Sequence, residues 1–117
     1  MPGARGEGVI HLADRDVHVL YTNRALMDAE RQIGKSILDV LDGFTRNTSG
    51  VTELAHLLLA GMQAARRDVR TGGPAPRLQD ALAVMDEAGF AAVATVVMEA
   101  VAAVLSYGGG QEENPNP

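Results

Sequence analysis

Cysteine and tryptophan are absent from this chain of 117 residues, and aromatic residues make up only 3% of it. Without cysteine, the protein can form neither a disulfide framework nor a thiolate metal site. Aromatic rings bury large areas, so their scarcity leaves the core to smaller side chains. The composition therefore predicts a core of leucine, valine, isoleucine, methionine and alanine.

Basic charge is also limited, because 10 lysine and arginine residues stand against 15 aspartate and glutamate residues, a net charge of -5. Proteins that bind nucleic acid depend on basic groups to neutralise phosphates. An acidic domain of this size is therefore a poor candidate for nucleic-acid binding. Residues 1–8 contain no apolar run, and we do not expect them to act as a signal or transit peptide.

A change in hydrophobic spacing near Tyr21 divides the chain into a β part and a helical part. Residues 9–12 and 17–21 are β-prone runs around a loop at residues 13–16, and the second run alternates with a period of two. Beyond Tyr21, apolar residues recur at helical spacing between helix-breaking signals. The expected helices, with their caps, span Asn23 to Gly34, Ser36 to Gly43, Val51 to Val69, Leu78 to Gly89, and Phe90 to Tyr107.

The predicted fold is mainly α, with an N-terminal two-stranded β-hairpin followed by a bundle of about five helices and a flexible C-terminal tail. We expect residues 1–8 to form a flexible arm, residues 9–107 a single domain, and residues 108–117 a disordered tail. The segment from Val51 to Val69 is apolar around most of its girth, which favours a central position. Gly61 within it disfavours a helix and indicates close approach of another backbone.

Three features could carry chemistry, and each has a simpler structural interpretation. Gly34-Lys35-Ser36 matches the end of a phosphate-binding loop, but the glycine that such a loop requires earlier is replaced by Ala29 within a helix. His11 and His18 could face each other across the hairpin, yet no carboxylate completes a metal-ligand set, which favours surface histidines. His56 lies on the polar stripe of its helix. Since no serine occupies a nucleophile elbow either, we expect no catalytic, cofactor-binding or metal-binding residues.

Glu99 is the only charged residue between Phe90 and Tyr107. It shares a narrow helical face with small or polar residues, opposite a row of valines, which predicts an amphipathic core helix with Glu99 at its rim. The members of that face are Ala92, Thr95, Glu99, Ala102 and Ser106. The segment is nearly long enough to span a bilayer, but a central acid costs about 2.5–3.5 kcal/mol, which disfavours a membrane span.

The order of these features resembles the small tail assembly chaperones of long-tailed phages and gene transfer agents. The matching parts, over about Val9 to Tyr107, are the hairpin, Thr22 to Glu30, Ile33-Gly34-Lys35-Ser36, Glu53 to Met62, and Asp86-Glu87-Ala88-Gly89 before the last apolar helix. The resemblance implies a non-enzymatic protein that binds the tape-measure protein, keeps it soluble, recruits tail-tube protein and then leaves. Such a protein would act in the cytoplasm of the bacterial host and be absent from the mature particle. The resemblance implies no cofactor and offers no catalytic residue.

Three alternative functions stay open. Some relatives in this family are structural components of the tail tube. A membrane-active small helical protein is a second alternative. A regulatory helical module such as an antitoxin is the third, although a DNA-binding regulator should carry a basic recognition helix, and none is visible.

The expected partner-binding residues come from helix faces. A chaperone for a long helical client needs an exposed apolar surface with a polar rim. Leu57 and Leu59 lie on either side of the apolar stripe centred on Leu54, Leu58 and Met62, so both cannot easily face one core. We expect one of the two leucines, with Phe44 and Met62, to contribute to a partner-binding or self-association patch. The alternative is that neighbouring helices cover both leucines.

We predict that the purified chain has no hydrolase or nucleotidase activity and retains neither ATP nor zinc, because no nucleophile or ligand set is complete. Elemental analysis and nucleotide extraction of the native protein measure this directly. Stoichiometric zinc or ATP would contradict the prediction.

Overall fold

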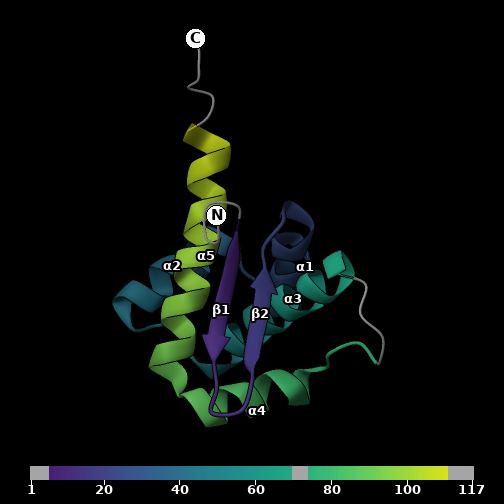
Figure 1. Ribbon diagram of the computed structural model, residues 1–117. Coiled ribbons are helices and arrows are strands. Elements are labelled where there is room, and N and C mark those ends of the chain that lie inside the picture. Colours follow the sequence, from purple (N-terminus) through teal and green to yellow (C-terminus); the bar gives the residue numbers. More distant parts are fainter. Residues whose placement is uncertain (1–5, 70–73, 111–117) are drawn as a thin grey trace.

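The computed structural model describes residues 6–69 and 74–110, in which a two-stranded antiparallel hairpin precedes five helices (Figure 1). The strands are β1 (Glu7–His11) and β2 (Asp16–Leu20). The helices are α1 (Asn23–Ile33), α2 (Ile37–Arg46), α3 (Val51–Val69), α4 (Leu78–Ala88) and α5 (Phe90–Gly110). This architecture confirms the predicted fold class.

Helix α3 lies at the centre of the fold, where it contacts α1, α4, α5 and β2. Its buried side chains cover more than half of the helix circumference and include Leu54, Ala55, Leu57, Leu58, Ala60 and Ala64. The predicted central position is therefore confirmed. The apolar Val51 is nevertheless 57% exposed, because it occupies the first position of the helix, before the turns that its neighbours cover.

The hairpin packs one face against the helices. Gly8 pairs with Val19 and Ile10 with Val17, and these residues share the inward face, on which Ile10 and Val19 are buried. Figure 1 shows β1 on the side of α5 and β2 on the side of α3, in agreement with their contacts. The predicted alternation of the second run is confirmed, since Val19 is buried and His18 is exposed.

Tyr21 holds the end of the hairpin on α3. Its side chain is 1% exposed, and its hydroxyl donates a 2.9 Å hydrogen bond to the backbone carbonyl of Leu57. Burial raises the pKa of the Tyr21 hydroxyl far above its usual value, so this donor keeps its proton. The ring comes this close because Gly61 has no side chain, and a Cβ there would lie 2.5 Å from Tyr21 Cζ. The prediction of a second backbone at Gly61 is therefore wrong, since an aromatic ring occupies the space.

Two helix boundaries also differ from the sequence-based prediction. Thr22, not Asn23, caps α1, because Thr22 Oγ1 accepts a hydrogen bond from the N–H of Ala25. Gly43 does not end α2, which continues to Arg46 and ends at Asn47 in the left-handed conformation. Gly43 is needed for packing instead, since a Cβ at this position would collide with Ser49 Oγ.

The two chain ends differ from the prediction where they are described. Strand β1 begins at Glu7, inside the predicted arm, and residues 1–5 lie outside the described residues. Helix α5 continues to Gly110 instead of ending at Tyr107, because glycine weakens a helix without forbidding it. Residues 111–117 of the predicted tail also lie outside the described residues.

Helix α5 presents the face that the sequence predicts to solvent. Its exposed residues include Ala92, Thr95, Glu99, Ala102 and Ser106, opposite the buried Val93, Val97 and Val101. The position of Glu99 at the rim is confirmed. Over the described ranges, no single helix is long and apolar enough to cross a membrane. The bent pair Leu78–Ala88 and Phe90–Ser106 reaches that length and apolar composition only when its two helices are taken together.

Replacing Gly61 with alanine should destabilise the fold by about 2 kcal/mol. The methyl group would overlap the Tyr21 ring, and overpacking typically costs about 1–3 kcal/mol, which outweighs the roughly 1 kcal/mol gained in helix propensity. Tyr21→Phe should cost only about 1 kcal/mol, because it removes one hydrogen bond and keeps the ring. Denaturant unfolding measures both changes. A Gly61→Ala variant as stable as the parent would disprove the contact.

Candidate protein-binding groove

The structure separates the four predicted partner-binding residues. Leu57 is fully buried in the core, with 0% exposure, so its side chain is not available to a partner. Of the two leucines, only Leu59 can therefore supply the predicted contribution, because Leu57 is enclosed in the core. Leu59, Met62 and Phe44 are each half-buried and packed against the core.

Phe44 takes part in an aromatic pair that the sequence analysis did not identify. Its ring centroid lies 6.2 Å from that of Phe90, with the planes inclined by 57°. This tilted arrangement is favourable for two aromatic rings. Since Phe90 begins α5, the pair joins α2 to the start of the last helix. Phe44 therefore has a packing role in this chain, while Phe90 keeps 39% of its surface exposed.

Met62 lines a groove of about 510 Å³ between the hairpin and the C-terminal half of α3. Most of the groove wall is apolar and is supplied by Val9, Val17, Val19, Leu20, Met62 and Ala65. Charged and polar side chains complete the wall at Glu7, His18, Arg66 and Asp68. A concave apolar surface bordered by polar groups is typical of a binding site.

The groove contains one of the four predicted residues, because Leu57, Leu59 and Phe44 do not line it. Sequence reasoning missed the contribution of the hairpin. The available signal was Leu20, an apolar residue on the face of β2 that the alternation assigns to solvent. An apolar side chain at such a position indicates either further packing or a binding surface.

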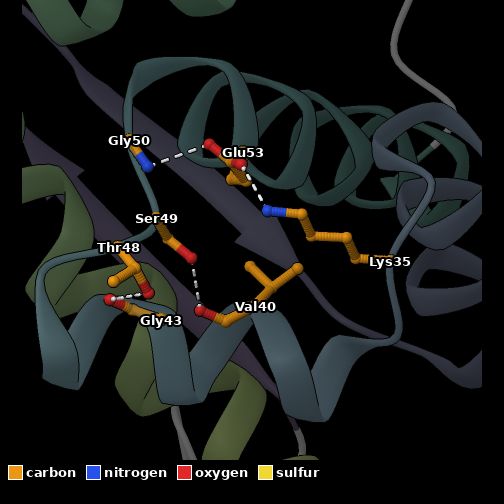
Figure 2. Close-up of polar contacts among 7 residues, drawn as sticks. All are labelled: Lys35, Val40, Gly43, Thr48, Ser49, Gly50 and Glu53. Atoms are coloured by element: carbon orange, nitrogen blue, oxygen red, sulfur yellow. Dashed lines mark hydrogen bonds and ion pairs between the residues drawn. The ribbon is translucent and has the colours of Figure 1, made fainter.

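The Gly34-Lys35-Ser36 stretch forms part of a helix junction, and Figure 2 shows its Lys35 directed toward Glu53. Lys35 Nζ donates to Glu53 Oε2 over 3.1 Å. Ser36 Oγ accepts the N–H of Asp39, as the predicted cap of α2. Gly34 adopts the left-handed conformation that ends α1, as predicted. The lysine of this motif is thus engaged with a carboxylate of α3, and the motif follows a helix, whereas a phosphate-binding loop follows a strand.

Glu53 is the central acceptor of the same junction. Besides Lys35, it binds the N–H of Gly50 through Oε1 over 2.9 Å, at the start of α3. The backbone N–H of Gly50, the backbone of Glu53 itself and the Lys35 ammonium all hold the pKa of the Glu53 carboxyl below its usual range. Nearby, Ser49 Oγ donates to the Val40 carbonyl over 2.9 Å (Figure 2). These contacts fix the loop between α2 and α3.

The two hairpin histidines do not face each other. His11 lies opposite Asp16 and His18 opposite Val9 in the strand register. His11 Nδ1 lies 2.8 Å from Asp16 Oδ1, and both side chains are well exposed. Within residues 6–69 and 74–110, no three histidine, aspartate or glutamate side chains form a group that could hold a metal ion.

Comparison with known proteins adds no relative: no family model matches the sequence, and neither curated proteins nor solved structures gave a significant match.

Replacing Glu53 with glutamine should lower stability by up to about 1 kcal/mol near neutral pH, because the pair with Lys35 lies at the surface. The folded-state pKa of Glu53 is lowered, so its contribution is complete above the ordinary value of 4.5 and is lost as the pH falls through the folded-state value. The parent and the variant should therefore converge in acid. Urea unfolding between neutral pH and pH values near the glutamate range measures this.

Lys35→Gln is the matched control for that measurement. Because the backbone hydrogen bonds lower the pKa of Glu53 more than Lys35 does, this variant should keep most of the pH dependence. A stability gap between parent and Glu53→Gln that stays constant through the acid range would rule out the carboxylate as its source.

Proposed function

We propose that this protein is a non-enzymatic tail assembly chaperone that binds the tape-measure protein while a tail is built. The order of the hairpin, the helices and their junction motifs, which resembles that of the tail assembly chaperones, supports the proposal. The observation that carries the proposal is the apolar groove beside the hairpin, which contains Met62 and has a partly charged wall. A protein that keeps an apolar client soluble needs a surface of this kind.

The walls of the groove are held in place before any partner arrives. One wall is the hairpin, which the buried hydroxyl of Tyr21 ties to the backbone of α3. The other wall is α3 itself, which is packed against four other elements. A preformed site loses little conformational entropy on binding, so its apolar area contributes more fully to affinity. This rigidity suits a surface that must capture a client during assembly.

Capture of the tape-measure protein of the same genome in a co-expression pull-down tests the proposal. Met62→Asp should reduce capture at least about tenfold while the fold is retained, because it places a charge in the apolar wall of a half-buried site. Leu38→Asp is the matched control, since Leu38 is 69% exposed and does not line the groove. It should leave both fold and capture unchanged.

Two further variants make the test sharper. Leu57→Asp should unfold the domain, because the Leu57 side chain is completely buried. Its circular dichroism spectrum is the reference for an unfolded variant. Leu59→Asp tests whether Leu59, the other leucine of the predicted partner-binding patch, contributes to capture. If the parent chain fails to capture the tape-measure protein, the proposed function is wrong. If Met62→Asp folds and captures normally, the groove is not the client site.

A further inference from the structure

Hydrogen bonds at both ends of the hairpin show which backbone groups of β2 face β1. The N–H of Tyr21 donates to the carbonyl of Gly6 over 2.8 Å, and the N–H of Leu12 donates to the carbonyl of Arg15 over 2.8 Å. In an antiparallel pair, hydrogen-bonded residue pairs alternate with non-bonded ones. The bonded pairs are therefore Gly6–Tyr21, Gly8–Val19, Ile10–Val17 and Leu12–Arg15.

The backbone N–H and carbonyl groups of Asp16, His18 and Leu20 consequently point away from β1. Among the residues that the structure describes, these outward backbone groups have no hydrogen-bond partner. They recur at every second residue, which is the spacing that a neighbouring strand would match. The free edge of β2 is thus an unused template for one more strand.

This free edge runs along the groove. Residues of both strands line it, three from β1 (Glu7 to Val9) and four from β2 (Val17 to Leu20). The opposite wall belongs to α3, which contacts β2, so the hollow reaches from the hairpin past the free edge of β2 to α3. Met62 and Ala65 of α3 form the apolar wall opposite the edge of β2. Backbone hydrogen-bonding groups and apolar side chains therefore line the same hollow.

We propose that an extended segment of the client polypeptide binds along β2 as a third strand of the sheet. Its N–H and carbonyl groups bond to those of His18 and Leu20, and every second side chain enters the apolar groove. A helical segment cannot do this, because its own backbone groups are already bonded to each other. A small apolar molecule would fill the groove but leave the edge unbonded. The inference rests on the proposed function for the identity of the client only.

The binding mode is tested first with a synthetic probe and the full chain. The probe is a short blocked peptide in which valine and threonine alternate between terminal lysines. Its matched control carries N-methyl groups on every second amide, which removes the donors and keeps the side chains. In amide-resolved NMR, the probe should shift the His18 and Leu20 amides and slow their hydrogen exchange, and the methylated peptide should not. Unchanged His18 and Leu20 amides with the unmethylated probe would overturn the proposal.

Two proline variants then test the same edge with the tape-measure protein. His18→Pro removes one N–H from the free edge of β2, and His11→Pro removes one from the outer edge of β1, so both keep the hydrogen bonds between the strands. Both histidines are exposed. His18→Pro should weaken capture at least about tenfold, and His11→Pro should leave it unchanged.

The outcomes separate the two proposals. Equal capture by folded His18→Pro and His11→Pro would overturn strand addition while the chaperone function stands. If His18→Pro does not fold, the peptide comparison decides the binding mode. A parent chain that binds the probe at β2 but fails to capture the tape-measure protein would overturn the chaperone function and leave strand addition supported.

Discussion

The hydrogen bond from the Tyr21 hydroxyl to the Leu57 carbonyl joins the β part of this protein to its helical part. The carbonyl of a helical residue accepts one bond within the helix, and its second lone pair is free for another donor. The tyrosine ring reaches that lone pair only because Gly61, one turn further along α3, has no side chain. One glycine and one tyrosine therefore set where the hairpin lies on α3, and every feature bounded by the hairpin depends on them.

The groove is the main consequence of that placement. Its walls come from both strands of the hairpin and from the second half of α3, so no single element forms it. The aliphatic core beneath is closely packed around α3, and Leu57 is part of that core, not of the surface. The groove lies beside a strand edge whose backbone groups are unpaired within the described chain, so one hollow offers apolar contact and hydrogen bonding together. That combination suits a polypeptide better than a small molecule.

A second set of polar contacts determines how α1, α2 and α3 follow one another. The Glu53 carboxylate accepts a hydrogen bond from the N–H of Gly50, at the start of its own helix, and another from Lys35, between α1 and α2. Gly43 allows Ser49 to pack against α2 and donate to the Val40 carbonyl. Gly34-Lys35-Ser36 matches the end of a phosphate-binding loop when read in order, yet the partner of Lys35 lies in a neighbouring helix. Their chemistry in this chain is structural, because each polar group serves a turn or a helix end.

Local signals in the sequence determined the elements of this fold. The period-two run, the caps at Gly34 and Ser36, the full extent of α3 and the two faces of α5 all follow from short-range rules that act within one helix or strand. Tertiary structure decided the rest. Gly61 and Gly43 could be seen as unusual, but only packing shows that a tyrosine ring and a serine occupy the spaces they leave. Helical spacing placed Leu57 and Leu59 on either side of one stripe. Only the packing of the other elements around α3 decides that Leu57 is the buried one. Contacts such as the Tyr21–Leu57 hydrogen bond join residues 36 positions apart, which no local pattern contains.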